Sequence, residues 1–192
     1  MAKSRSSKQP AAARGWIFWF ALFAIAAAGF TAIIVAAARR SSSPVVVPQG
    51  VETFDIRARS HTQGRVQYPQ TPPVGGDHAP VWQNCGFYDA PIPDETAVHS
   101  LEHGAVWITY RSDLPSAQVE TLRRLAGRQT FILVSPFPDL LSAVVASAWG
   151  VQLRAESTDD PRIVEFVRAF RIGPQTPEPG ASCTGGSGDL SR

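Results

Sequence analysis

Residues 94–110 read DETAVHSLEHGAVWITY, and the rest of the 192-residue chain is organised around this stretch. The pattern predicts a short helix that begins with Asp94 as its N-cap and ends at Gly104 in a left-handed conformation. Residues 105–110 then alternate as the residues of a buried strand do. The stretch therefore predicts a helix that leads directly into the core of a sheet.

Two of the four histidines of the chain lie in this predicted helix, at positions 99 and 103. A spacing of four places His99 and His103 one turn apart on the same face, where they can bind one metal ion. His78 is the best candidate for a third ligand, because residues 75–77 (Gly-Gly-Asp) form a flexible turn before it. His61 ranks next.

Carboxylates near these histidines extend the candidate site. Glu102, Glu95 or Asp77 can act as a ligand, as a general base or as a group that orients an imidazole. Imidazole and carboxylate ligands favour zinc or copper as the cofactor. The only methionine is Met1, which excludes a thioether-rich copper(I) site.

The same residues permit two other interpretations. His99, Glu102 and His103 match the H-x-x-E-H signature of inverted zinc peptidases. Against this interpretation, Gly104 ends the helix at once, whereas that chemistry needs a long, buried helix. Alternatively, the histidines are structural and cap the last carbonyl groups of the helix.

The N-terminal region predicts a membrane anchor. Residues 16–38 form an uncharged run of 23 residues, which as a helix can cross a hydrocarbon core of about 30 Å. We expect a cytoplasmic tail at residues 1–14, a transmembrane helix at 15–39 and a linker at 40–50. A signal peptide cleaved near residues 36–38 is the alternative.

The charges indicate the orientation and the partners. Four basic residues precede the apolar run and two follow it, so we expect a cytoplasmic N-terminus and a C-terminal domain outside the cell membrane. Six of the 18 basic residues lie in the first 40 positions, which leaves 12 against 16 acidic residues in the remainder. Nucleic-acid binding is therefore not expected. The expected partners are the membrane, through one span, and an envelope protein.

The chain has two cysteines, Cys85 and Cys183. An even number in an exported domain favours a disulfide. Such a bond would close a loop of nearly a hundred residues, which corresponds to about 4–5 kcal/mol in the chain-entropy account. Two thiolate metal ligands are the rival interpretation.

The remaining pattern predicts an α+β domain at residues 51–173 and a Pro/Gly-rich tail at 174–192. Strands are expected at 51–60, 105–110, 130–135 and 144–149, with residues 151–155 either extending the last strand or bending back; further helices are expected at 115–127 and 161–171. After the histidine helix, the order β-α-β-β-α indicates a small mixed or mostly antiparallel sheet with helices packed on one face.

Several motifs in combination resemble a known family. They are Tyr68, Pro72-Pro73-Val74-Gly75-Gly76-Asp77-His78, Trp82, Cys85-Gly86-Phe87-Tyr88-Asp89, Val98-His99-Ser100-Leu101-Glu102-His103-Gly104 and Tyr110. Over about residues 50–186 the chain resembles the domain-of-unknown-function 3105 family, bacterial proteins with one N-terminal membrane helix and an exported domain. In the usual family pattern a Thr-Ser pair stands where this chain has Val74 and Gly75. The resemblance implies that His78, His99, Glu102 and His103 form one constellation, and it implies no reaction.

Two hypotheses for the function follow. The first is a membrane-anchored, extracytoplasmic domain that binds one transition metal through His78, His99 and His103, with Glu102 beside them. The second is a non-metal accessory or interaction module of a cell-envelope complex. Neither hypothesis specifies a substrate or an oligomeric state.

Overall fold

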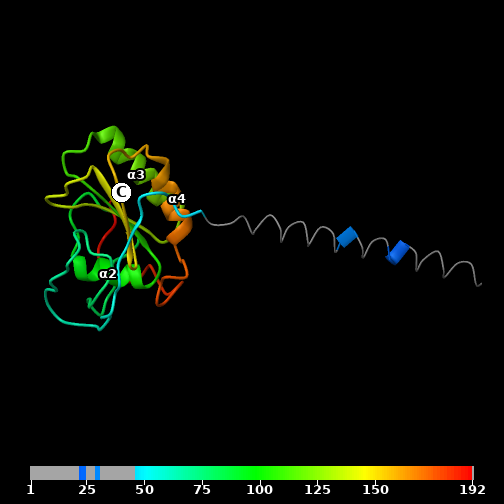
Figure 1. The fold of residues 1–192 in the computed structure, drawn as a ribbon, viewed down its shortest axis with the longest axis horizontal. Coiled ribbons are helices and arrows are strands. Elements are labelled where there is room, and N and C mark those ends of the chain that lie inside the picture. Colours follow the sequence, from blue (N-terminus) through cyan, green and yellow to red (C-terminus); the bar gives the residue numbers. More distant parts are fainter. Residues whose placement is uncertain (1–21, 25–28, 31–45, 192) are drawn as a thin grey trace, which may run out of the picture. The chain divides into compact units, whose positions relative to one another are not determined.

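The computed structural model describes residues 22–24, 29–30 and 46–191. The predicted cytoplasmic tail and most of the predicted transmembrane helix lie outside these residues; residues 22–24 and 29–30 are helical. Among the described residues, none of the helices has the length and apolar character needed to cross a membrane. The fold described below is that of residues 46–191 (Figure 1).

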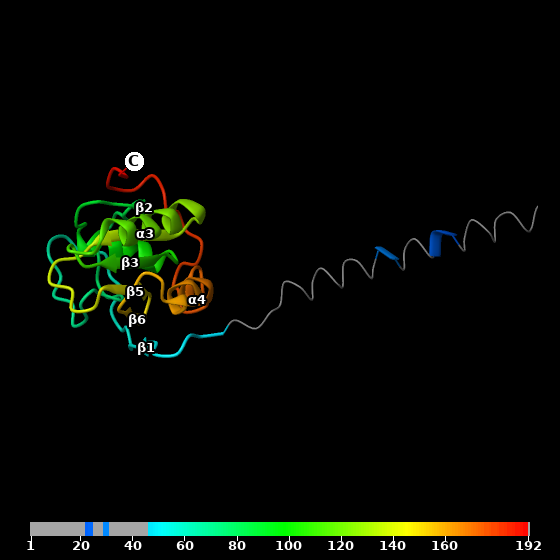
Figure 2. The ribbon, with the colours of Figure 1, turned by 90° about the horizontal axis from the view of Figure 1, so that it is seen from above.

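A six-stranded mixed sheet forms the centre of the domain, with the strand order β1-β6-β5-β3-β4-β2 (Figure 2). The strands are β1 (Glu52–Thr53), β2 (Gly86–Phe87), β3 (Val106–Tyr110), β4 (Ile132–Pro136), β5 (Val144–Ala148) and β6 (Val151–Ala155). Strand β4 runs parallel to β2 and β3, and the other pairs are antiparallel. The mixed sheet was expected from the sequence, and β3, β4 and β5 lie within two residues of their predicted bounds.

The strand predicted at residues 51–60 is limited to β1, Glu52–Thr53, and the structure decides between the two alternatives for residues 151–155. Residues 151–155 bend back, so that β5 and β6 form an antiparallel hairpin across Trp149 and Gly150, whose φ of 70° suits a tight turn. The order after the histidine helix is therefore β-α-β-β-β-α. Strand β2 was not predicted, because two residues within a Pro- and Gly-rich segment carry no alternation.

Three helices pack on the sheet: α2 (Asp94–Glu102), α3 (Ser116–Arg128) and α4 (Pro161–Phe170). Helix α4 begins as predicted, because the side chain of Asp160 accepts a hydrogen bond from the backbone N–H of Arg162. Helix α2 begins one residue earlier than predicted: Pro93 is its N-cap, and Asp94 is the first helical residue.

Helices cover both faces of the sheet, which corrects the prediction of a single covered face (Figure 1). On one face, Val106 and Ile108 of β3 pack with buried residues of α3 and α4. On the other face, Trp107 packs with Val98 and Leu101 of α2. All five residues of β3 are buried, and an apolar strand of this kind requires a cover on both sides. Helix α2 provides the second cover and so fixes the histidines against the sheet.

Candidate metal centre

The C-terminus of α2 is closed by a turn that depends on Gly104. The backbone N–H of Gly104 donates to the carbonyl of Leu101 at 3.0 Å, and that of Ala105 donates to the carbonyl of Ser100 at 2.9 Å. These two bonds form a Schellman motif. Gly104 has a φ of 104°, as the sequence predicts for a left-handed residue. His103 is therefore the C-cap, immediately after the last helical residue, Glu102.

The Pro/Gly-rich C-terminal segment runs back from α4 to this helix end (Figure 1). The N–H of Glu178 donates to the carbonyl of Glu102 at 3.0 Å, and the N–H of Gly180 donates to the carbonyl of His103 at 3.0 Å. These carbonyls belong to the helix terminus, where partners within the helix are lacking. The segment thus completes the helix end and lies against the histidines.

A second segment brings two more histidines to α2. His78 and His61 form a parallel β-bridge, in which the N–H of His78 donates to the carbonyl of Ser60 and the N–H of Thr62 donates to that of His78. The hydroxyl of Tyr68 donates to the carbonyl of Asp77 at 2.7 Å. Burial raises the pKa of Tyr68, so this donor stays protonated. These bonds hold the His78 loop over the helix.

The two segments converge on one cluster, to which His61, His78, His99 and Glu102 contribute. Each residue offers one ligand atom, and the four atoms all lie within 4.8 Å of one another. His78 is fully buried, and His99 and Glu102 are each 4 % exposed, whereas His61 is exposed. Three imidazoles and one carboxylate form a possible metal site, open to solvent on the side of His61.

Backbone carbonyls fix the orientation of three imidazoles. Nδ1 lies 2.8 Å from the Gly76 carbonyl in His78, 2.7 Å from the Ala79 carbonyl in His99 and 2.6 Å from the Ser182 carbonyl in His103. A carbonyl oxygen only accepts, so each Nδ1 must carry the proton. In the neutral ring each Nε2 therefore has a free lone pair. Metal-binding histidines show this arrangement, because the outer bond sets the tautomer and the ring orientation.

The contact between His78 and Glu102 is consistent with an ion between them. Nε2 of His78 lies 3.0 Å from Oε2 of Glu102, yet this buried nitrogen lacks a hydrogen bond of acceptable geometry. Two facing acceptors repel each other unless a proton or a metal ion lies between them. Two ligands bound to one zinc ion at about 2.0–2.1 Å are separated by about 3–3.5 Å when adjacent, which fits this distance.

His99 and His103 form a second close pair, with 3.0 Å between their Nε2 atoms. The pKa of His99 is lowered to about 4, mainly by burial; the bond to the Ala79 carbonyl opposes the shift, and the neighbouring His103, His78 and His61 add to it. His99 is thus neutral at pH 7, with its Nε2 lone pair available. Trp82 lies beside both rings, with centroid distances of 5.8 Å to His99 and 5.2 Å to His103.

The sequence-predicted candidates are placed as follows. His78, His99 and Glu102 lie in the group of four, and its fourth member is His61, which the sequence ranked next after His78 as a further ligand. His103 is outside this group, and its assignment as a ligand of the same ion stays a prediction.

The other carboxylates near the cluster have different places. Glu95 accepts a hydrogen bond from the N–H of Val66, and Asp77 accepts one from the N–H of Ser60, so both carboxylates hold loops in position. Glu178, whose Oε2 lies 3.8 Å from Nε2 of His103, was missed, because a carboxylate in a Pro/Gly-rich tail shows no pattern.

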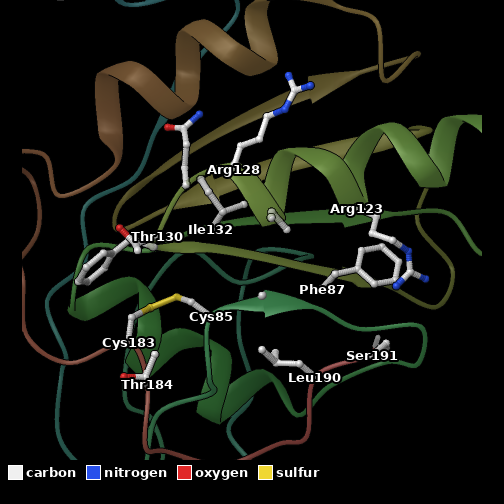
Figure 3. A pocket seen from close by; sticks show the side chains of 15 residues that line it. Cys85, Phe87, Arg123, Arg128, Thr130, Ile132, Cys183, Thr184, Leu190 and Ser191 are labelled. Atoms are coloured by element: carbon white, nitrogen blue, oxygen red, sulfur yellow. A yellow bond between two sulfur atoms is a disulfide. The ribbon is translucent and has the colours of Figure 1, made fainter.

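The predicted disulfide is confirmed. Cys85 and Cys183 are bonded, and no free cysteine is present among the described residues. The thiolate-ligand interpretation is therefore excluded. The bond borders a cavity of about 460 Å³, shown in Figure 3, whose lining includes Arg123 and Arg128 but neither histidine nor carboxylate. The residues that could hold a metal thus lie in the histidine cluster and not among those that line this cavity.

Fold and site together define an α+β domain with a buried His/Glu cluster that can hold a metal. The chain matches the family "Protein of unknown function (DUF3105)" over residues 60–185, which is 126 of 192 residues, and it belongs to this family. The matched region contains every residue of the cluster. A search of curated proteins and a search of solved structures returned no significant match.

Proposed function

We propose that this protein is a membrane-anchored, extracytoplasmic domain that binds one transition-metal ion, zinc or copper, through Nε2 of His78 and His99 and a carboxylate oxygen of Glu102. The observation that carries the proposal is the shared orientation of the imidazoles. The Nδ1–H groups of His78 and His99 are bound to carbonyl oxygens. The bare Nε2 of His78 therefore lies 3.0 Å from the buried Glu102 carboxylate without a hydrogen bond, and the bare Nε2 of His99 lies 3.0 Å from Nε2 of His103.

The donor set supports a borderline ion. Imidazole nitrogen and carboxylate oxygen suit Zn²⁺ and Cu²⁺, and the cysteines are not available as thiolates because they form a disulfide. The fourth position belongs to His61 or His103. His61 lies within the group of four and faces solvent, while His103 is joined to it through His99.

Metal analysis of the purified full-length protein tests this function. We expect one Zn²⁺ or Cu²⁺ per chain, with the affinity lowered by more than about a hundredfold in His78→Asn and in Glu102→Gln, because each loses a direct ligand. Asparagine is chosen because its amide N–H can replace the Nδ1 donor while the Nε2 ligand is lost. Glu156→Gln, which changes an exposed carboxylate, serves as the control.

Two results would refute metal binding at this cluster. One is a sub-stoichiometric content of both metals in the wild-type protein. The other is a content that remains unchanged when His99→Ala and His103→Ala are combined. The first result would favour the alternative function, a non-metal accessory or interaction module of an envelope complex, and the second would place the ion elsewhere in the protein.

The proposed location rests on the apolar run at residues 16–38 and its basic flanks. The disulfide supports it, because such bonds persist in oxidising compartments outside the cytoplasm. Protease added to intact spheroplasts is expected to digest the domain. A domain that is protected until the membrane is permeabilised would contradict this orientation.

A further inference from the structure

His103 and Glu178 form a second set of potential ligands next to the group of four. Nε2 of His103 lies 3.0 Å from Nε2 of His99 and 3.8 Å from Oε2 of Glu178. The two sets share His99 and differ in exposure. The side chain of Glu178 is 60 % exposed, whereas His78 is fully buried.

The chemistry of this second set also calls for a cation. The carbonyls of Ala79 and Ser182 hold the Nδ1 protons of His99 and His103, so two lone pairs face each other across 3.0 Å. The carboxylate of Glu178 adds negative charge on the solvent side. A proton or a metal ion shared by the two imidazoles relieves this repulsion.

The backbone keeps this set in place. Glu178 donates its N–H to the carbonyl of Glu102, and Gly180 donates to the carbonyl of His103. The carboxylate of Glu178 therefore stays close to His103 even though its side chain is exposed. Glu178 thus lies on the solvent side of the cluster, and Glu102 lies on its buried side.

We propose that His99, His103 and Glu178 form an outer ion position, through which a transition-metal ion passes between solvent and the inner ligands His78, His99 and Glu102. This inference rests on the proposed function. Because His99 belongs to both sets, the ion can keep one bond while it exchanges the others one at a time. Without the outer ligands, the ion must lose most of its ligands before it gains new ones, which raises the barrier in both directions.

Stopped-flow transfer of the bound ion from the full-length protein to a chromophoric chelator tests the outer position. Zn²⁺ and Cu²⁺ are used in parallel, and the ion that binds at one per chain is followed. In Glu178→Gln we expect the uptake and release rates to fall together by about tenfold or more, the effect of a barrier raised by about 1.4 kcal/mol. The dissociation constant stays within about threefold of the wild-type value, because it is the ratio of the two rates.

Two further variants sharpen the result. His103→Asn, which can keep the bond to the Ser182 carbonyl but lacks Nε2, should slow exchange in the same way. Glu156→Gln should leave it unchanged, because Glu156 follows Ala155 of β6, which pairs with Val144 at the far end of the sheet.

Unchanged exchange rates in Glu178→Gln would overturn the inference. The cation shared by His99 and His103 would then be a proton. An affinity loss in His103→Asn as large as in His78→Asn would also overturn it, because His103 would then be an inner ligand. Both results leave the proposed function intact. A wild-type protein that binds neither ion refutes the proposed function itself.

Discussion

Replacing both cysteines, Cys85→Ser with Cys183→Ser, is expected to lower the free energy of unfolding by about 4–5 kcal/mol. The bond joins residues 98 positions apart, so its loss releases a long loop in the unfolded chain. Domains of this size have a total stability of only about 5–15 kcal/mol. We therefore expect the variant to be close to unfolding at 37 °C, as urea denaturation followed by circular dichroism would show.

The same variant should lose metal affinity, for a local reason. The Ser182 carbonyl that orients His103 directly precedes Cys183, and the N–H of Cys85 donates to the Cys183 carbonyl at 2.8 Å. Reduction of the wild-type protein by a phosphine should reproduce the stability loss, while the double variant should be insensitive to the phosphine. A loss below about 1 kcal/mol would mean that the backbone bonds alone hold the C-terminal segment, against the chain-entropy account.

Gly104→Ala is expected to destabilise the domain by about 2–3 kcal/mol or more. Gly104 has a φ of 104°, which side chains disfavour, and an added Cβ would lie 2.9 Å from Cα of Ile172. Ile172 donates its own N–H to the carbonyl of Gly104, so this backbone cannot move away without losing that bond. Thermal unfolding of the variant measures the effect.

Gly127→Ala provides the matched control. Gly127 lies inside α3, and an added Cβ would meet nothing within 4 Å. Alanine is a better helix former than glycine, so this variant should be more stable by up to about 1 kcal/mol. If Gly104→Ala leaves the domain as stable as Gly127→Ala does, the turn after α2 tolerates a side chain. Gly104 then does not fix the position of His103.

Sequence patterns predicted the parts of the fold whose residues carry their own periodicity. Strands β3 and β4 are runs of apolar residues, and Asp160 before Pro161 indicates the start of α4. Strand β2 could not be predicted in this way, because its two residues exist as a strand only through pairing with Leu133 and Val134 of β4. The cover on both sheet faces was missed for a related reason: α2 is too short for its sequence to show what it packs against.

The residues of the candidate site also differ in whether a local sequence pattern could predict them. His99 and Glu102 lie on one helix, so their spacing in the sequence is also their spacing in space. His61 is brought to the cluster by a bridge to His78, 17 residues away, and Glu178 by a segment without secondary structure. Contacts of this kind depend on the path of the whole chain, which local patterns do not record. The tail at 174–192 illustrates this, since its composition gave no reason to place it against α2.

The orientation of the imidazoles has a consequence for mutational tolerance. The three acceptors are main-chain carbonyls of Gly76, Ala79 and Ser182, and any amino acid supplies such a carbonyl. Side chains at positions 79 and 182 can therefore be exchanged among homologous chains without loss of the acceptors, provided that the backbone keeps its course. The residues that supply these acceptors would then vary among homologous chains while the positions of the carbonyl groups stay the same. Selection would act instead on the residues that fix the course of the backbone, among them Gly104 and the two bonded cysteines.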